Sequence, residues 1–304
     1  MSVLIPFKNR ISWTREALES VLGQTYADFE IILVDDGSTD DVGALRRAED
    51  PRVRYLRNDG RGAPAARNAG LRFARGKYLA LLDSDDLFVP RKLEVQVAYM
   101  ERHPDLALTH TSYVRIDENG RELVEVDSAR DFHGRVYPRI YLYCPIASST
   151  VMLRRDALAD DGFEEALSIA YDELLWIRLA QRSEFGGIPE PLSRIRVHGA
   201  IATHDLDLQI RAKQNILRYA LANDRELRGV PRRVVLSRTY GAIGEFYLLQ
   251  RRVLRSLPFT LRALAAWPLN WSLYRFHGTL VQRYARTRAR RLRGLLARSR
   301  ASSR

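Results

Sequence analysis

The sequence predicts an α/β fold with a mostly parallel central sheet flanked by helices, followed by an α-helical C-terminal extension. Three observations support this prediction. Short apolar runs alternate with helical patterns up to about residue 120, which is typical of parallel strands joined by right-handed crossovers. From about residue 106 to residue 196 the pattern is mixed. After His204 it becomes helical.

The first part of the chain reads as strand, helix, strand, helix. Apolar residues recur there with the periods of strands and of amphipathic helices. The expected strands cover 2–6, 30–34, 52–56 and 77–82, and the expected helices cover 14–22, 41–48, 65–74 and 91–102. Ligands bind beyond the carboxyl ends of the strands in such sheets, so the loops after these strands are the expected place of a site.

The later elements are expected in two groups. The mixed region predicts strands at 106–116, 149–153 and 193–197 and a helix at 172–182. The helical region predicts helices at 206–223 and 233–256. In the second of these helices, apolar residues recur at a spacing that fits one helix face.

Composition bounds the class of protein. The 304 residues suffice for one large or two medium domains with a hydrophobic core. With 46% hydrophobic and 28% charged residues, the chain is neither disordered, collagen-like nor a disulfide scaffold. Its single cysteine, Cys144, forms no disulfide within the chain and favours a reducing compartment. The N-terminus lacks the pattern of a secretory signal. The longest uncharged stretch near the C-terminus, 263–274, contains Pro268 and is too short to span a bilayer.

The net charge of +12 is unevenly distributed. Residues 205–304 contain 22 basic and 5 acidic residues, whereas residues 1–204 carry a net charge of −5. The segment 256–304 has 11 arginines, no acidic residue, and Trp267 and Trp271 among other apolar residues. Arginines beside aromatic and apolar residues favour binding to an anionic membrane surface. Two alternatives are that the aromatic residues pack onto the rest of the protein, or that residues 283–304 bind nucleic acid, for which no recognisable module is present.

Three carboxylates follow the fourth predicted strand directly, in the motif Asp83-Ser84-Asp85-Asp86. Crowded carboxylates repel one another unless a cation or hydrogen-bond donors compensate them. Mg²⁺ or Mn²⁺ typically takes one or two carboxylates together with the phosphates of its substrate. The motif therefore indicates a metal site, and its alternative is a solvated acidic turn that caps the next helix.

Two further loops contain polar residues in patterns that suit a nucleotide. Residues 35–40 follow the second strand, where a carboxylate can accept a hydrogen bond from a base or sugar and Gly37 permits close approach. Helix capping is the alternative for this loop. Residues 58–70 open a helix with a glycine-rich entry and two arginines, which suits an anion. The sequence has no P-loop motif, and it has no GxGxxG after the first strand, which weakens a nicotinamide-binding interpretation.

Taken in order, these segments resemble the inverting glycosyltransferases of family 2, which have the GT-A fold. The matching segments are residues 3–10, 34–40, 58–70, 83–86, 161–165, 171–179 and 189–198. The resemblance covers about residues 1–204, which implies a nucleotide-sugar-binding half at 1–105 and an acceptor and catalytic half at 106–204. Residues 205–304 are then a basic helical extension.

The resemblance implies donor-binding roles in the first half. Asp36 would bind the base of a nucleotide sugar. Pro6 and Phe7 would form the wall beside it, with Arg67 nearby. Asp83 would contact the ribose or the metal shell.

It also implies the metal and catalytic residues. Ser84 belongs to the donor site in the same motif. Asp85 would hold Mn²⁺ or Mg²⁺ on the diphosphate, and His198 matches a histidine that reaches the diphosphate or the metal in some members. Asp172 would be the general base, because it stands four residues before Trp176 as the catalytic aspartate does in the family. Without the resemblance, Asp172 reads as an acid favoured by the helix dipole and His198 as a loop histidine.

Two positions depart from the family pattern. Lys8 stands where the family usually has tyrosine, and Tyr171 stands where glutamate commonly precedes the catalytic aspartate. A retaining reaction would need a second carboxylate as nucleophile, and the sequence has no matching candidate.

We therefore expect a metal-dependent inverting glycosyltransferase. Its donor would be a UDP-, dTDP- or GDP-sugar, and its acceptor a glycan or lipid-linked hydroxyl in cell-surface polysaccharide or glycolipid synthesis. We expect a cytoplasmic protein, peripheral at the inner face of the membrane. Two alternatives remain open: a non-catalytic binder of anionic surfaces or nucleic acid on a decayed transferase scaffold, and a nucleotidyltransferase on a related sheet.

Overall fold

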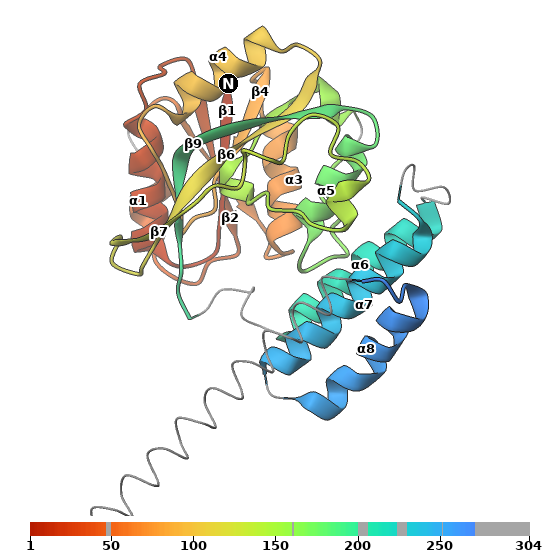
Figure 1. Cartoon of the computed structure of the whole chain (residues 1–304). Coiled ribbons are helices and arrows are strands. Elements are labelled where there is room, and N and C mark those ends of the chain that lie inside the picture. Colours follow the sequence, from red (N-terminus) through yellow and green to blue (C-terminus); the bar gives the residue numbers. More distant parts are fainter. Residues whose placement is uncertain (47–49, 160, 200–205, 224–229, 251, 271–304) are drawn as a thin grey trace, which may run out of the picture. The chain divides into compact units, whose positions relative to one another are not determined.

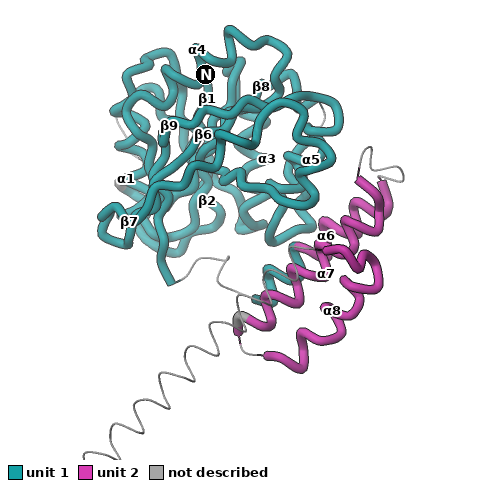
Figure 2. Tube along the Cα trace, in the orientation of Figure 1, with its two compact units in different colours: residues 1–212 teal, residues 213–304 magenta. Residues whose placement is uncertain are grey.

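The structure is a computed structural model that describes residues 1–46, 50–159, 161–199, 206–223, 230–250 and 252–270 (Figure 1). The chain divides into two compact units, Met1–Ala212 and Lys213–Arg304 (Figure 2). The domain boundary predicted between residues 204 and 205 lies just before this division.

Strands and helices alternate through most of the first unit. The described strands are β1 (Ser2–Phe7), β2 (Glu30–Asp36), β3 (Val53–Asn58), β4 (Tyr78–Leu81), β5 (Leu87–Phe88), β6 (Leu106–Ile116), β7 (Glu122–Val126), β8 (Met152–Arg154) and β9 (Glu184–Arg196). The described helices are α1 (Ile11–Leu22), α2 (Gly43–Arg46), α3 (Ala63–Phe73), α4 (Lys92–Arg102) and α5 (Tyr171–Ala180). Three short 3-10 helices are η1 (Arg139–Tyr141), η2 (Ser148–Thr150) and η3 (Asp156–Leu158).

All described strands belong to one sheet, in the order β3-β2-β1-β4-β8-β6-β9-β5, with β7 paired to β6. The strands β3, β2, β1 and β4 run parallel, and so do β6 and β9. β8 is antiparallel to both β4 and β6, and it thereby joins the two parallel groups. The predicted α/β fold is confirmed, with antiparallel pairs added in its second half.

Helices cover both faces of the parallel strands. Every residue of β1 is buried, as expected for a central strand covered on both sides. Val3 and Ile5 pack into one core with residues of α1 and α4, whereas Leu4 points to the opposite face. A Cβ atom on Gly70 would lie 2.8 Å from Leu4 Cδ2, so this glycine lets α3 approach the sheet closely.

The second unit contains two packed helices, α7 (Arg232–Leu249) and α8 (Val253–Ala266), and most of α6 (Leu206–Asn223). Ser237 of α7 donates a hydrogen bond of 2.7 Å to the carbonyl of Ala263 in α8. Tyr247 stacks on Phe259 with ring centroids 5.6 Å apart. The first contact pairs the start of α7 with the end of α8, and the second pairs the end of α7 with an earlier residue of α8, so the helices are antiparallel.

Two of the predicted elements are wrong. A single helix at 233–256 cannot fold back on itself, and the antiparallel packing requires the break between Leu249 and Val253. The strand predicted at 149–153 is only Met152–Arg154, because the preceding residues form η2. The strand predicted at 193–197 is the end of the longer β9.

Parts of other predictions lie outside the described residues. The helix expected at 41–48 is described as α2, and residues 47–49 lie outside. Of the segment 256–304, residues 256–270 are described, whereas Trp271 and the arginine-rich residues 283–304 are outside. Among the helices that the structure describes, none is both long and apolar enough to cross a membrane.

Candidate active site

The polar loops singled out from the sequence lie at the carboxyl ends of β1, β2, β3 and β4 (Figure 1). The four strands are parallel neighbours, so their carboxyl ends meet at one edge of the sheet. η2, the first turn of α5 and the residues after β9 contribute further side chains to the same edge, as the contacts below show.

The loop after β1 is fastened to the loop after β2. Asn9 and Arg10 adopt left-handed backbone conformations with φ of 58° and 56°. The Asn9 Oδ1 atom accepts hydrogen bonds from the backbone amides of Thr39 at 2.8 Å and Asp40 at 3.2 Å. The Asn9 amide donates to Ser38 Oγ at 2.8 Å. These hydrogen bonds between the two loops offset the cost of the left-handed conformation.

Pro6 and Phe7 end β1 and are both buried. Phe7 is only 3% exposed and its ring meets the edge of Tyr55, with centroids 6.3 Å apart. Both residues therefore form part of the core beneath the candidate site.

The two carboxylates that end β2 have different surroundings. Asp35 is fully buried and accepts hydrogen bonds from Tyr55, from the Ser38 amide at 2.7 Å and from Arg57 at 2.8 Å. Burial alone would raise the pKa of Asp35, but Tyr55, Ser38 and Arg57 together lower it. We assign Asp35 a structural role in the loop, because its carboxylate oxygens already accept hydrogen bonds from Tyr55, Ser38 and Arg57.

Asp36 faces the glycine-rich loop instead. Its carboxylate accepts hydrogen bonds from Asn58 Nδ2 at 2.7 Å and from the Gly62 amide at 3.0 Å. Gly37 and Gly60 let the two loops touch, because a Cβ on Gly37 would lie 2.9 Å from Gly60 Cα. Both glycines have positive φ. Asp36 therefore lies at the start of α3, because the two loops approach each other at glycines whose backbone conformation other residues adopt less easily.

Arg67 links the 83–86 motif to the start of α5. The side chain is buried, forms an ion pair with Asp83 and donates to the Tyr171 hydroxyl at 2.6 Å. Its guanidinium also lies over the rings of Tyr171 and Phe163. Burial opposes the charged form, yet Tyr171 and Asp83 raise the pKa of Arg67.

Tyr171, which replaces the glutamate common in the family, stays protonated. Removal of water from the hydroxyl raises its pKa to about 12, and the negative charge of Asp172 acts in the same direction. Tyr171 is therefore a neutral partner of Arg67 at any physiological pH.

The aspartates of the 83–86 motif are compensated one by one. Asp83 pairs with Arg67, and its amide donates to Ser149 Oγ at 3.0 Å. Asp85 Oδ2 is 3.0 Å from Arg10 Nη1 and 2.8 Å from His198 Nε2. Ser84 lies between them, partly exposed.

Asp86 is the buried member of the motif. It accepts hydrogen bonds from Ser149 Oγ at 2.5 Å and from the Arg196 amide at 2.9 Å. Burial and the like charges of Asp85 and Asp83 raise its pKa well above the usual value for aspartate. The carboxylates that the sequence leaves crowded are thus stabilised by donors from η2 and β9 and by two cationic side chains.

Asp172 lies in the first turn of α5, half-buried. Its Oδ2 atom accepts a hydrogen bond from Ser148 Oγ at 2.7 Å, and its Oδ1 atom accepts one from the Glu173 amide at 2.8 Å. Asp172 is also close enough to Asp83 to raise the pKa of that carboxyl. Trp176, one turn later, is fully buried.

His198 follows β9 and is 4% exposed. Its ring packs on Trp13 of α1, with centroids 4.8 Å apart, while Nε2 faces Asp85. The described residues contain no cluster of three or more His, Cys, Asp or Glu side chains arranged to hold a metal.

The structure therefore brings Asp36, Asp83, Asp85, Asp172 and His198 to one edge, where Arg67 joins Asp83 to Tyr171, the neighbour of Asp172. Sequence reasoning missed four contributors: Ser148, Ser149, Arg10 and the backbone of Arg196. The two serines belong to no motif with a recognisable spacing. Arg10 is only the last residue of the matching segment 3–10.

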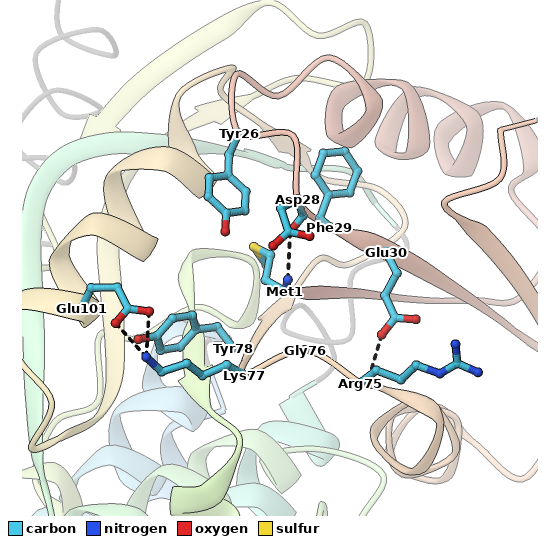
Figure 3. A pocket seen from close by; sticks show the side chains of 10 residues that line it. All are labelled: Met1, Tyr26, Asp28, Phe29, Glu30, Arg75, Gly76, Lys77, Tyr78 and Glu101. Atoms are coloured by element: carbon cyan, nitrogen blue, oxygen red, sulfur yellow. Dashed lines mark hydrogen bonds and ion pairs between the residues drawn. The ribbon is translucent and has the colours of Figure 1, made fainter.

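A cavity of about 500 Å³ lies elsewhere, at the amino ends of β1 and β4 (Figure 3). Tyr26, Phe29 and Tyr78 contribute aromatic rings to it, and Lys77 pairs there with Glu101. None of the predicted site residues lines it. It occupies the end of the strands opposite to the candidate site.

Comparisons with known proteins agree with the sequence motifs. The family model described as "Glycosyl transferase family 2" matches residues 2–163. An uncharacterized glycosyltransferase of Rickettsia felis is 44% identical over 205 residues, which are 67% of this chain and 34% of that protein. The chain thus spans about a third of that relative's length. WfaP of Escherichia coli, named a UDP-Glc:alpha-D-GlcNAc-diphosphoundecaprenol beta-1,3-glucosyltransferase, is 33% identical over 165 residues, covering 54% of this chain and 64% of that protein.

Solved structures share the fold at low sequence identity. TarS 1–349 of S. aureus in complex with UDP-GlcNAc has a TM-score of 0.62 at 19% identity, covering 86% of this chain and 79% of that one. The mannosyltransferase PcManGT of Pyrobaculum calidifontis, in complex with GDP-Man and Mn²⁺, has a TM-score of 0.57 at 21% identity, covering 93% and 79%. These likenesses confirm the expected GT-A architecture.

Proposed function

The chain belongs to glycosyl transferase family 2, and from this membership we propose that it transfers a sugar from a nucleoside diphosphate sugar to a hydroxyl acceptor. The transfer would be a single displacement that inverts the anomeric carbon. The observation that carries the proposal is the meeting of Asp36, the 83–86 motif and Asp172 at one sheet edge, where Arg67 pairs with Asp83 and donates to Tyr171 beside Asp172.

The names of similar proteins support the classes of donor and acceptor. TarS was solved with UDP-GlcNAc and PcManGT with GDP-Man and Mn²⁺, while the name of WfaP gives UDP-Glc and a diphosphoundecaprenol-linked sugar. We propose for this chain a UDP-, dTDP- or GDP-sugar and a glycan or lipid-linked acceptor. Such a reaction fits cell-surface polysaccharide or glycolipid synthesis.

The proposed donor site runs from Asp36 to the 83–86 motif. Asp36 already accepts hydrogen bonds from Asn58 and Gly62, which fix its orientation, and its remaining lone pairs suit an N–H group of a base. Pro6 and Phe7 support this end from below. Further along the edge, Arg67 holds Asp83 in place for the ribose, and Ser84 lies toward the diphosphate.

Asp85 and His198 fit a divalent cation. A carboxylate oxygen and an imidazole nitrogen meet there at 2.8 Å, and Mn²⁺ or Mg²⁺ commonly takes one or two protein ligands together with substrate phosphates. When bound, the cation would stabilise the negative charge that develops on the leaving diphosphate.

Asp172 is the proposed general base. Ser148 and the Glu173 amide each occupy one of its two oxygens, so the carboxylate is oriented while lone pairs remain to accept the proton of an attacking hydroxyl. Tyr171 contacts Arg67 without carrying a negative charge. A glutamate at position 171 would place one more negative charge beside Asp172.

A thermal-shift screen of nucleotide sugars tests the function. UDP-Glc, UDP-GlcNAc, dTDP-Glc and GDP-Man, each with and without Mn²⁺, should include one donor that raises Tm only with the metal, because a ligand that binds the folded state stabilises it. Asp85→Ala should abolish that shift. If no donor shifts Tm, a non-catalytic scaffold accounts for the chain better than a transferase does.

We further propose that the second unit binds the anionic inner face of the membrane, so that the protein is cytoplasmic and peripheral. Four apolar side chains of α8 are exposed: Val253, Leu254, Leu257 and Leu261. The last three recur at i, i+3 and i+7 and form one stripe, with Leu254 83% exposed. Exposed arginines of the same helix flank it, and no acidic residue follows Glu245.

Liposome sedimentation tests this proposal. The double variant Leu254→Asp and Leu261→Asp should weaken binding to phosphatidylglycerol vesicles about tenfold or more, because each leucine loses about 1.5–3 kcal/mol of burial. Leu123→Asp on β7 is the matched control, since Leu123 is exposed to 56% but belongs to the first unit. Equal binding by wild type and the double variant would show that α8 does not contact the membrane.

A further inference from the structure

Asp85 is held by two positively ionisable side chains at the same oxygen. Oδ2 receives the guanidinium of Arg10 at 3.0 Å and the imidazole of His198 at 2.8 Å. The His198 side chain is nearly buried, whereas that of Arg10 is 37% exposed. One of the two partners is therefore built into the core and the other reaches in from the surface.

Arg10 combines a fixed backbone with a partly exposed side chain. Its left-handed backbone precedes α1, and the neighbouring Asn9 is fastened to Thr39 and Asp40. Trp13, one turn into α1, lies under the Arg10 guanidinium at 5.8 Å from its ring centroid. The guanidinium therefore contacts the aromatic ring while it pairs with Asp85.

We propose that Arg10 neutralises Asp85 before the metal is bound and binds the donor diphosphate afterwards. This inference rests on the proposed function, since it takes Asp85 as a metal ligand and a nucleoside diphosphate as the anion. Arg10 thus competes with the cation for Asp85 in the free protein, and it binds the donor diphosphate once metal and donor are present.

Electrostatics gives the reason for the exchange. A guanidinium and a divalent cation repel each other strongly at the distance that one carboxylate imposes. Arg10 would therefore turn away from Asp85 when the cation binds, and the phosphates of a donor held by that cation would offer it acceptors. The planar fork of arginine matches phosphate oxygens well.

The other cation of this loop does not fill the role. The Lys8 side chain extends to the glycine-rich loop, where Nζ is 4.0 Å from the position that a Cβ of Gly60 would occupy. Arg196 is also near Asp85, but it binds the Asp85 carbonyl rather than the carboxylate and pairs with Glu16. Of the side chains that the structure describes, Arg10 and His198 contact the Asp85 carboxylate.

Metal binding to the full-length protein without nucleotide tests the first half. Mn²⁺ binding is measured by electron paramagnetic resonance for wild type, Arg10→Gln and Arg15→Gln, the last an exposed arginine of α1 that serves as matched control. Arg10→Gln should bind Mn²⁺ about two- to fivefold more tightly, the range of a partly exposed ion pair. Arg15→Gln should match wild type, and Asp85→Ala should lose the site.

Nucleotide binding tests the second half. With saturating Mn²⁺, the affinity for UDP, GDP or dTDP, whichever wild type binds, should fall about tenfold or more in Arg10→Gln, the size expected of a hydrogen bond to a charged group. Arg10→Lys should recover part of the loss, because it keeps the charge without the fork.

Opposite shifts of the two affinities are the signature of the proposal. An unchanged or weaker Mn²⁺ affinity in Arg10→Gln overturns the competition, and an unchanged nucleotide affinity overturns the role on the diphosphate. A fall in both affinities together with a lower Tm shows that Arg10 only supports the loop. If wild type binds none of UDP, GDP and dTDP, the proposed function fails along with the diphosphate role, while the metal measurement still decides the competition for Asp85.

Discussion

Asp172 offers the most direct test of chemistry at a single residue. Asp172→Asn should lower kcat about 10²- to 10⁴-fold, because asparagine cannot take the proton of the acceptor hydroxyl. Ser148→Ala should lower it less, since the carboxylate keeps its second hydrogen bond from the Glu173 amide.

Steady-state kinetics with the donor found in the thermal-shift screen measures both effects. Glu173→Gln is the matched control, because it removes a carboxylate from the same helical turn and should keep kcat near the wild-type value. Near wild-type turnover in Asp172→Asn would assign the base elsewhere.

A buried lysine makes a pH-dependent contribution to stability. Lys92 is fully buried, and its Nζ donates to the Thr150 carbonyl at 3.0 Å beside the ring of Phe88. Burial lowers its pKa well below the usual value. The unfolded chain therefore binds the proton more readily, and stability should rise with pH up to about 10.4, the ordinary lysine pKa.

Urea unfolding between about pH 7 and pH 9.5 measures how the free energy of unfolding of the first unit depends on pH. The range stays below the pKa of ordinary lysines, which therefore keep their protons throughout. Lys92→Met should flatten the rise of the free energy of unfolding. Lys77→Met is the control, because Lys77 is exposed and Glu101 raises its pKa. Parallel slopes for wild type and Lys92→Met would mean that Lys92 keeps its proton in the fold.

The side chains of the candidate site could be predicted unevenly. Asp36, Asp85 and Asp172 stand in short contiguous motifs, so their residue types and order suffice to single them out. Ser148 and Ser149 could not be found, because a serine becomes informative only when the fold brings it to a carboxylate. The sequence also says nothing of which cation will meet which aspartate, since this depends on the paths of loops distant along the chain.

At the scale of elements, long segments with a clear period were predicted best. The strand at 106–116 and the helix at 206–223 agree with β6 and α6 to the residue. The wrong helix at 233–256 had apolar residues at the right spacing on both sides of its break, so periodicity alone could not reveal the turn. β5 and η2 are too short to leave a periodic signal.

Glu245 of α7 gives a prediction at this scale. Burial raises its pKa to about 7 from 4.5, against the attraction of Arg238. The folded state thus binds the proton more readily than the unfolded chain, so the helical hairpin should lose stability as pH rises from about 4.5 to about 7. Above that range the loss is complete.

Circular dichroism melts at about pH 5 and pH 8, on either side of the transition, test this expectation. Glu245→Gln should remove the difference and stabilise the second unit at the higher pH by about 1 kcal/mol, a value reduced for the partial exposure of the side chain. An unchanged pH dependence in Glu245→Gln would place the titrating group elsewhere.

At the scale of the whole molecule, the division into two units predicts two unfolding transitions. Each unit has its own packed interior, so calorimetry of the full chain should resolve separate peaks. Mn²⁺ with the bound donor should raise the Tm of one peak only, because a ligand stabilises the unit that holds it.

Asp85→Ala provides the control for this experiment. It should abolish the shift of the responding peak and leave the other peak in place. A donor that moves both peaks together would mean that the units unfold as one cooperative body.

The charge asymmetry of the chain follows the same division. The basic excess of +17 in residues 205–304 belongs mainly to the second unit, while the carboxylates of the candidate site belong to the slightly acidic first. The sequence could predict this separation because net charge depends on composition alone. It could not predict that apolar side chains of α8 would remain uncovered, since that depends on which face packs against α7.

The hydrogen bond from the Arg196 amide to Asp86 has a consequence for protein synthesis. The 83–86 loop leaves the ribosome early, but the backbone that secures its buried carboxylate arrives only with the end of β9. Until then Asp86 lacks this donor, whereas β1, β2, β3 and β4 can already pair. A growing chain can thus assemble its parallel strands well before its 83–86 loop is set, so translation itself delays the completion of the candidate site.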